Sequence, residues 1–384
     1  MRQKLLVSAS KIFFVVFVMS DNIGIYIHIP FCKRKCNYCD FFSSAASEEE
    51  YDNYVSILNE KINYWGNVAC ETVSSVYFGG GTPSVLGTDR LCNILSAVKK
   101  SFIVTPDAEI TVEVNPESGK ALDFYKMLKE GFNRISIGMQ SSIESELKIL
   151  GRIHSTEDVI TTVESAKRGG FNNISLDLMM GIPQQTISSL KNSIDFCASC
   201  GVTHISSYIL KIEEGTRFYS KKEELSLPSE DDTAQLYLEA VEYLEKFGYK
   251  QYEISNFAKP TFESRHNTLY WKCGEYIGIG PSAHSFYKGK RFFYERDMKE
   301  FAENITIADG DGGSEDEFIM LSLRLKSGLV FKEYDKRYGK ALSPAFINKI
   351  KKYCEMGFME SDEKHVCFTP KGFLVSNSII SELI

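Results

Sequence analysis

The stretch YIHIPFCKRKCNYCDF, residues 26–41, decides how the rest of the chain is interpreted. Its first residues alternate apolar side chains in the manner of a half-buried β-strand. Three cysteines follow at C-x3-C-x2-C spacing, Cys32, Cys36 and Cys39. Thiolates are soft ligands that suit iron–sulfur clusters or zinc. A zinc site normally takes a fourth Cys or His at a paired spacing, and none stands near Cys39. The motif therefore predicts an iron–sulfur centre directly after a strand.

The number of cysteines bears on the type of cluster. Cubane clusters usually take four thiolates. Three thiolates predict a [4Fe–4S] cluster with one open iron, at which a substrate can bind. Lys33, Arg34 and Lys35 separate the first two cysteines and offset the negative charge of thiolates and sulfides.

Composition excludes several classes of protein. The 384 residues carry a net charge of -7, which argues against a broad nucleic-acid surface. Three of the ten cysteines lie within eight residues, and the others are scattered. This usage predicts a reducing, cytoplasmic compartment with one metal site and not a secreted disulfide scaffold.

Residues 1–20 combine Arg2, Lys4 and Lys11 with the apolar run IFFVVFVM. The run resembles a weak signal peptide, but it is too short to span a membrane and no small-residue cleavage site follows. Two alternatives stand. We favour Met19 as the true start of the protein; a genuine leader would allow association with a membrane surface.

Strand and helix patterns alternate up to about residue 255. This alternation predicts an α/β fold with a parallel sheet. Six strand–helix units are too few for a full eightfold barrel, so a partial, open (βα)6 TIM-type barrel fits, as does a doubly wound sheet. The expected strands are 25–29, 75–78, 109–114, 134–138, 173–178 and 204–210. The expected helices are 48–65, 89–100, 121–130, 157–168, 187–200 and 230–247.

The rest of the chain predicts two further parts. Residues 21–255 form the core, 256–307 an irregular aromatic-rich segment, and 308–384 a small C-terminal α+β domain. The composition of 308–314, ADGDGGS, predicts a flexible linker. Helices at 315–326 and 345–357 and strands within 357–369 resemble a winged helix. No Arg-rich recognition helix is present, so DNA binding is not expected.

Polar residues follow the expected strands at the edge where the cysteines lie. A turn, Gly79-Gly80-Gly81-Thr82-Pro83, follows the second strand, and its glycines let backbone approach a ligand closely. Ligands of parallel α/β folds bind at the carboxyl ends of strands. We therefore expect these groups to share a site with the cysteines: Glu113, Gln140, Arg152 and Asp177.

The motifs together resemble the radical S-adenosylmethionine (SAM) superfamily, specifically the proteins similar to oxygen-independent coproporphyrinogen III oxidase. The resemblance covers most of residues 25–290, and the tail resembles the C-terminal HemN-type domain of that family. The stretches that carry it are YIHIPFCKRKCNYCDFF, YFGGGTPS, EVNPE, RISIGMQS, LGRIHS, LDLMMGIPQQT, QYEISNFAKP, HNTLYW and IGIGPSAHSF.

The resemblance implies a role for each matching residue. Cys32, Cys36 and Cys39 would bind the cluster. Tyr26 and Tyr38 would lie beside the cluster and SAM. Methionine contacts would come from Gly80, Gly81 and Thr82, and the nucleotide pocket from Glu113, Gln140, Arg152 and Asp177. An electron donor such as flavodoxin or ferredoxin is implied as a partner. The generic chemistry is reductive cleavage of SAM to methionine and a 5′-deoxyadenosyl radical.

Two subgroups share these motifs. The oxidases have a further cysteine two residues after the third, where this chain has Phe41. Residues 266–271, HNTLYW, match the HNxxYW signature of the heme chaperone subgroup called HemW. That resemblance implies heme as a ligand and acceptor hemoproteins as partners, including respiratory enzymes of membranes. The departure from the oxidase pattern at Phe41 argues against oxidation of coproporphyrinogen.

His266 is the candidate axial ligand of heme, because imidazole commonly fills that role. His28, His204 and His284 are alternatives, of which His28 is expected to support the cluster site. Three hypotheses therefore stand: a heme chaperone on a radical-enzyme scaffold, a radical enzyme acting on a porphyrinogen, and a radical enzyme with another substrate. An RNA substrate is disfavoured by the acidic balance.

Overall fold

A computed structural model describes residues 22–384 of the chain. The expectations for residues 1–20 lie outside the described residues. Among the residues that are described, no helix is long and apolar enough to cross a membrane.

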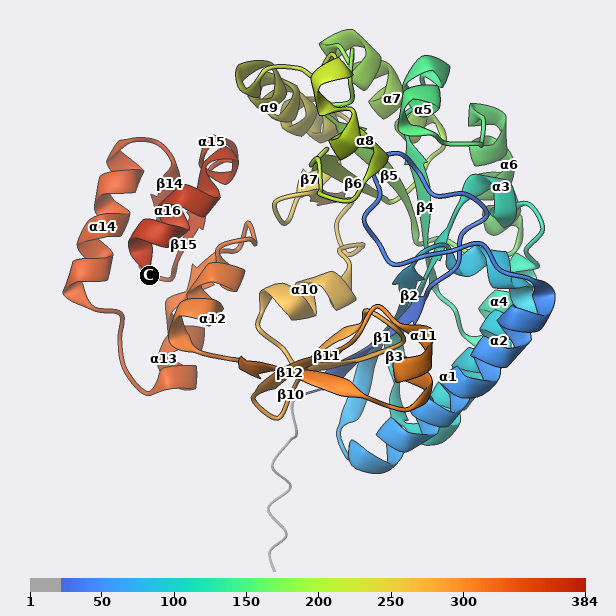
Figure 1. Cartoon of the computed structure of the whole chain (residues 1–384). Helices are drawn as coiled ribbons and strands as arrows, with labels where there is room; N and C mark the ends of the chain where they lie inside the picture. Colours follow the sequence, from blue (N-terminus) through green and yellow to red (C-terminus); the bar gives the residue numbers. More distant parts are fainter. Residues whose placement is uncertain (1–21) are drawn as a thin grey trace, which may run out of the picture.

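Six parallel strands form the centre of the molecule, and each is hydrogen-bonded to the strand that precedes it in the chain (Figure 1). This sequential order is that of an open barrel; a doubly wound sheet would reverse its order at a switch point. The expectation of a partial barrel is therefore confirmed. The strands are β1 (Ile23–Ile29), β2 (Thr72–Gly80), β3 (Ile103–Val114), β4 (Arg134–Gln140), β5 (Ile174–Met180) and β6 (His204–Ile209).

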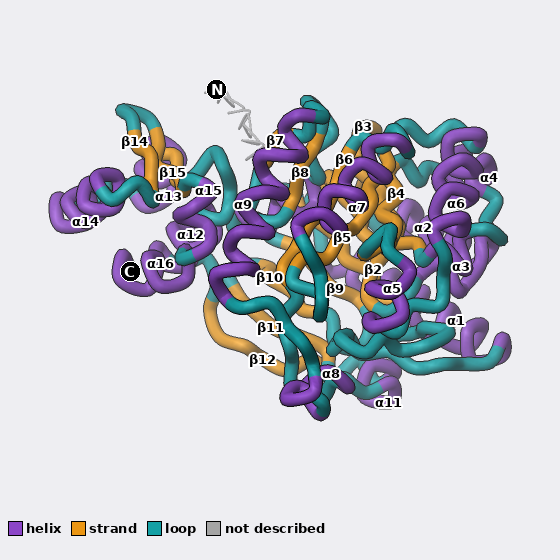
Figure 2. The backbone as a smooth tube through the Cα atoms, turned by 90° about the horizontal axis from the view of Figure 1, so that it is seen from above, coloured by secondary structure: helices purple, strands orange, loops and turns teal. Residues whose placement is uncertain are grey.

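Helices cover the outer face of these strands, as the view from above shows (Figure 2). The main ones are α1 (Glu48–Val68), α2 (Gly87–Ser101), α4 (Phe124–Glu130), α6 (Thr156–Arg168), α7 (Ile187–Ser199) and α9 (Glu230–Lys246). Short helices lie in the loops: η1 (Pro83–Leu86), α3 (Pro116–Gly119), α5 (Glu144–Leu150), α8 (Arg217–Ser220) and η2 (Lys222–Glu224).

The alternation of side chains in β1 explains how the barrel is filled. Ile25 and Ile27 are completely buried in the apolar core, together with Leu58 of α1. The residues that alternate with Ile25 and Ile27 face the inside of the barrel, because successive side chains of a strand face opposite sides. Tyr26 thus stacks on Tyr77 of β2 inside the barrel, with ring centroids 6.3 Å apart. The apolar face holds the helices, and the polar face builds the site.

The sheet continues beyond the barrel on both sides. On one side β8 (Asn256–Ala258) pairs with β6 and with β7 (Lys250–Gln251). On the other, β9 (Tyr276–Ile279) runs parallel to β1. Beyond it lie β10 (His284–Tyr287), β11 (Lys290–Tyr294) and β12 (Thr306–Asp311), with α10 (Arg265–Trp271) and α11 (Met298–Ala302) in the connections.

The expectation of a flexible linker at 308–314 is wrong for most of that stretch. Residues up to Asp311 belong to β12, which pairs antiparallel with β11, Tyr294 opposite Thr306 and Lys290 opposite Asp311. Cross-strand pairing of the backbone here outweighs a composition that favours turns.

The C-terminal part forms a second body beside the barrel in both views (Figures 1 and 2). Its order of helix, strand, two helices and two strands is that of a winged helix, with the sheet order β13-β15-β14. Its backbone joins the barrel where the N–H of Lys326 donates to the carbonyl of Tyr252, 2.9 Å away. The elements are α12 (Glu315–Ser322), β13 (Leu329–Val330), α13 (Phe331–Tyr338), α14 (Pro344–Glu355), β14 (Met359–Ser361), β15 (His365–Phe368), α15 (Pro370–Leu374) and α16 (Ser376–Leu383).

Candidate functional site

A cavity of about 620 Å³ lies at the carboxyl ends of the parallel strands. Its size is typical of pockets that hold small molecules or cofactors. Most of the residues singled out from the sequence share its wall: Cys32, Cys36, Tyr38, Cys39, Gly80, Gly81, Thr82, Glu113, Gln140, Arg152 and Asp177. Tyr26 and His266 do not line it.

The cysteine loop between β1 and α1 is anchored to the loops around it by Asn37. The N–H of Asn37 donates to the carbonyl of Leu150 (2.9 Å), and its side-chain amide donates to that of Ile149 (2.8 Å). The carbonyl of Asn37 accepts from the N–H of Phe218 (2.9 Å). A loop without regular structure is thus held at three points, which fixes the cysteines over the cavity.

The sulfur atoms of the loop face hydrogen-bond donors. Cys32 Sγ lies 3.2 Å from the hydroxyl of Thr82, and Arg152 Nη1 donates to Cys36 Sγ at 3.5 Å. Burial raises the pKa of Cys39 to about 11 and also raises the pKa of Cys32. Metal ligation needs thiolates. The hydroxyl of Thr82 and the charge of Arg152 act to lower the pKa of Cys32, and they offset part of the effect of burial.

The donor set fits an iron–sulfur cluster better than a single metal ion. Three thiols face one cavity, and within residues 22–384 no three His, Cys, Asp or Glu side chains converge on a site for one ion. Each thiolate of a cubane cluster binds a different iron, so its three cysteines need not converge on one point. The ten cysteines are all free thiols.

The glycine turn after β2 brings two loops into contact. The N–H of Gly81 donates to the carbonyl of Ile29 (2.8 Å), and that of Thr82 to Phe31 (2.7 Å). A Cβ on Gly81 would lie 2.6 Å from the oxygen of Phe31. Gly80 has φ +109, and its Cβ would lie 2.7 Å from the ring of His28. Only glycine therefore allows this approach, which places Thr82 beside Cys32.

Two half-buried carboxyl groups line the cavity, Glu113 and Asp177. Glu113 accepts a hydrogen bond from the hydroxyl of Tyr77 (2.8 Å), and Asp177 accepts one from Ser136 (3.0 Å). Burial raises the pKa of Glu113 to about 7 and raises the pKa of Asp177. Such carboxyl oxygens can accept from an ammonium group or from sugar hydroxyls.

Gln140 ends β4 with φ 68, a left-handed conformation that is unusual for a residue with a side chain. Its Oε1 accepts from the hydroxyl of Tyr208 (2.7 Å). Tyr208 also lines the cavity, although no motif singles it out. Strain of this kind clusters at binding sites and is held by the surrounding contacts.

Tyr26 and His28 lie behind the wall of the cavity. The Tyr26 hydroxyl is 3.1 Å from His28 Nδ1, and His28 Nε2 is 3.1 Å from the carbonyl oxygen of Phe42. Burial lowers the pKa of His28 to about 4, so the ring is neutral near pH 7. His28 thus contacts the end of the cysteine loop through Phe42, and its support of the cluster stays a prediction.

His266 is buried inside the barrel, where its ring stacks on that of Tyr77, a residue of the cavity wall, with ring centroids 5.2 Å apart. Nδ1 lies 2.8 Å from the hydroxyl of Ser75, and Nε2 lies 2.7 Å from that of Tyr270. Both ring nitrogens are therefore engaged, and ligation of heme by His266 would require one bond to open. The next residue, Asn267, lines the cavity. Helix α10 thus contributes to the cavity wall through Asn267, a residue of the HNxxYW motif to which the sequence analysis gave no role.

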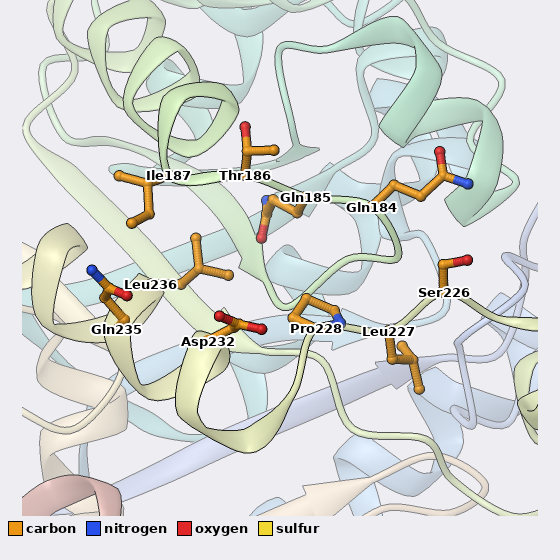
Figure 3. Close-up of a pocket in the computed structure, with 10 residues that line it drawn as sticks. All are labelled: Gln184, Gln185, Thr186, Ile187, Ser226, Leu227, Pro228, Asp232, Gln235 and Leu236. Atoms are coloured by element: carbon orange, nitrogen blue, oxygen red, sulfur yellow. The ribbon is translucent and has the colours of Figure 1, made fainter.

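A second cavity, of about 340 Å³, lies between the start of α7, residues 226–228 and α9 (Figure 3). Its lining includes Gln184, Gln185, Thr186 and Asp232. Gln185 and Asp232 serve the local structure: Gln185 accepts from the N–H of Gly181, and Asp232 bonds with Ser229 at the start of α9. No thiol lines this cavity, which has no evident part in the cysteine site.

Comparisons with known proteins agree with this geometry. Residues 26–197 match the family described as the radical SAM superfamily, and residues 316–375 match the HemN C-terminal domain. The protein named heme chaperone HemW from Bacillus subtilis is 35% identical over 373 residues, which cover 94% of this chain and 98% of that protein. The protein of the same name from Escherichia coli is 38% identical over 264 residues, which cover 68% of this chain and 69% of that protein.

A solved structure shows the same fold. It is that of coproporphyrinogen III oxidase (HemN) from Escherichia coli, described as a radical SAM enzyme. The TM-score is 0.79 at 21% identity, with 94% of this chain and 89% of that chain covered. The likeness extends through the barrel and the C-terminal domain.

Proposed function

This chain belongs to the radical SAM superfamily and, within it, to the family of heme chaperone HemW proteins, and on that basis we propose that it binds heme and delivers it to acceptor hemoproteins. The observation that carries the proposal is the similarity along nearly the whole chain to a protein of that name. The cysteine loop lies within the radical SAM match, and the tail lies within the match to the HemN C-terminal domain.

The cysteine site is proposed to hold a [4Fe–4S] cluster through Cys32, Cys36 and Cys39. Thr82 and Arg152 would stabilise two of the thiolates by the hydrogen bonds described above. When bound and reduced, the cluster supplies the electron that cleaves the sulfonium of SAM. The protein's part is to orient the groups and to exclude water.

SAM is proposed to occupy the cavity beside the cysteine loop. Gly80, Gly81 and Thr82 lie next to that loop and would face the methionine part. The polar wall would take the nucleotide through Glu113, Gln140, Arg152 and Asp177. Glu113 and Asp177 offer acceptors, while Arg152 offers a fixed positive charge.

Coproporphyrinogen oxidation is the second candidate, since the fold is that of HemN. Likeness at 21% identity carries the fold alone. The expected extra cysteine is absent, and Phe41 stands in its place with 64% of its surface exposed. The chaperone function is therefore preferred.

The partners follow from the proposed function. Acceptor hemoproteins, among them respiratory enzymes of membranes, would receive heme, and a flavodoxin or ferredoxin would reduce the cluster. We place the protein in the cytoplasm, because an oxygen-labile cluster and cysteines that form no disulfide among the described residues require a reducing compartment.

The experiment that tests the proposal is anaerobic reconstitution followed by two assays. One measures binding of heme and its transfer to an apo-cytochrome; the other measures vinyl groups formed from coproporphyrinogen III. We expect transfer without vinyl product. Vinyl product without transfer would replace the chaperone function by the oxidase.

A further inference from the structure

The cavity opens to solvent through a rim of exposed side chains. We define the rim by residues that both line the cavity and lie at the surface: Arg34, Lys35, Phe41, Ile209, Lys211 and Arg296. They come from the cysteine loop, the end of β6 and the segment after β11, which are far apart in the sequence. The rim thus combines two apolar side chains with four cations.

The apolar members of the rim are unusually exposed. Phe41 has 64% of its surface in solvent and Ile209 has 38%. Leu210, which is half-buried, continues the apolar surface into the cavity. A cluster of exposed apolar groups at the mouth of a polar cavity is typical of a binding site.

Two of the four cations are neutralised. Lys211 forms an ion pair with Glu213 at 2.7 Å, and Arg296 pairs with Asp40 at 3.0 Å. The latter pair ties the segment after β11 to the cysteine loop, so that both sides of the rim are held together.

The other two cations remain available to a ligand. Among the described residues, no carboxylate lies within ion-pair distance of Arg34 or Lys35. The Nζ of Lys35 donates to the backbone carbonyl of Phe41 at 3.1 Å, so that among the described residues its ammonium group is hydrogen-bonded without an ion pair. The rim therefore carries two cations without an ion-pair partner in the same loop as Phe41, on a chain whose net charge is -7.

We propose that this rim is the heme site, with the macrocycle over Phe41 and Ile209 and the propionates against Arg34 and Lys35. The inference rests on the proposed function and adds the place where heme binds. Heme has apolar faces and two carboxylates on one edge, so it matches a surface that pairs exposed apolar groups with free cations. The wall below, which carries Glu113, Arg152 and Asp177, is the part proposed to hold SAM, which leaves the rim for the macrocycle.

The test is a titration of the full-length protein with ferric heme, followed by difference absorbance, with and without the reconstituted cluster. Phe41→Asp, Ile209→Asp and the double variant Arg34→Glu/Lys35→Glu should each raise the dissociation constant at least tenfold. Ile209 lies outside the cysteine loop, so its variant separates loss of the heme site from damage to the loop.

Matched controls carry the same substitutions elsewhere. Tyr125→Asp on α4 and Lys100→Glu on α2 alter exposed side chains remote from the rim, and heme binding should stay within twofold of the wild type. Heme dimethyl ester, which lacks the two charges, should bind the wild type and the Arg34/Lys35 double variant equally well.

The outcomes separate failure of the proposed heme location from failure of the proposed chaperone function. If the wild type binds heme and all three rim variants bind it equally well, the location at the rim is overturned while the chaperone function stands. If the wild type itself binds no heme, the proposed function fails. Loss of heme binding in His266→Ala, with the rim variants unaffected, would also overturn the location.

Discussion

Asn115 joins Thr82 to Arg152. Its side-chain nitrogen donates to Thr82 Oγ1 at 3.0 Å, and its side-chain oxygen accepts from Arg152 Nη2 at 2.8 Å. Thr82 and Arg152 in turn contact the sulfurs of Cys32 and Cys36. The side chain of Asn115 thus connects Thr82 and Arg152, which contact the sulfurs of Cys32 and Cys36. Because Asn115 donates to the Thr82 oxygen, the hydroxyl proton of Thr82 stays free to donate to sulfur.

Asn115→Leu should therefore weaken the cysteine site. The substitution leaves the half-buried guanidinium of Arg152 without one acceptor. Loss of a hydrogen bond to a charged group costs about 1.5–3 kcal/mol. We expect a lower free energy of unfolding in urea and less iron retained per chain after anaerobic reconstitution. Asn63→Leu on an exposed part of α1 is the control. Equal iron retention in the two variants would show that the hydrogen bonds of Asn115 do not stabilise the cysteine site.

Gly80→Ala should destabilise the turn after β2 for two reasons, the strain of its positive φ and a clash of the new Cβ with the His28 ring. Gly289 also has a positive φ, +72, but nothing lies within 4 Å of a Cβ there, so Gly289→Ala should cost about 1–2 kcal/mol. At Gly80 the Cβ would also press on the His28 ring. We expect a larger loss of unfolding free energy and weaker SAM binding by calorimetry. Equal losses at the two positions would contradict this contact.

His266→Ala tests whether the histidine of the HNxxYW motif is structural. Both of its ring nitrogens are hydrogen-bonded in the interior, so the variant should lose about 1–3 kcal/mol of unfolding free energy by leaving Ser75 and Tyr270 without their partner. Heme binding by the folded fraction should be unchanged. His266→Asn, which keeps one polar contact, should recover part of the stability.

The raised pKa of Glu113 predicts a pH dependence of stability. A folded pKa of about 7 lies above the ordinary value of 4.5, so burial favours the protonated form. Stability from this neutral carboxyl is fully present below about pH 4.5 and is lost as the pH rises through about 7. Glu113→Gln stays neutral, so its unfolding free energy relative to wild type should rise between pH 5 and pH 8, by on the order of 1–3 kcal/mol.

SAM binding gives the second readout for Glu113. The ionised carboxylate is the better acceptor, so SAM affinity of the wild type should increase as the pH rises through about 7, and Glu113→Gln should abolish that dependence. Glu144→Gln, an exposed change on α5, should follow the wild type. A wild type whose affinity is constant across this range would exclude Glu113 as the group responsible.

Much of the barrel and its site could be predicted from the sequence, because local patterns determine them. Strand alternation and the turn after β2 place Glu113, Gln140 and Asp177 at one edge, and all three line the cavity with the cysteines. The strands begin and end within a few residues of the expectation, except that β3 starts at Ile103, six residues early.

The remaining features depend on contacts between distant segments. Residues 306–311 form a strand only because β11 lies beside them. Asn115 and Arg296 act through partners distant in the sequence, Arg152 and Asp40. The environment of His266 likewise depends on Ser75, which is 191 residues away. No local pattern could indicate these contacts.

The central claim is that the protein binds heme and transfers it to acceptor hemoproteins. The most direct measurement loads the anaerobically reconstituted protein with ferric heme, removes unbound heme, and adds an apo-cytochrome in excess. The account predicts that the absorption spectrum of the holo-cytochrome appears faster than with the same amount of heme released from serum albumin. Heme that stays on the protein, or that reaches the apo-cytochrome no faster than from albumin, would contradict a chaperone function.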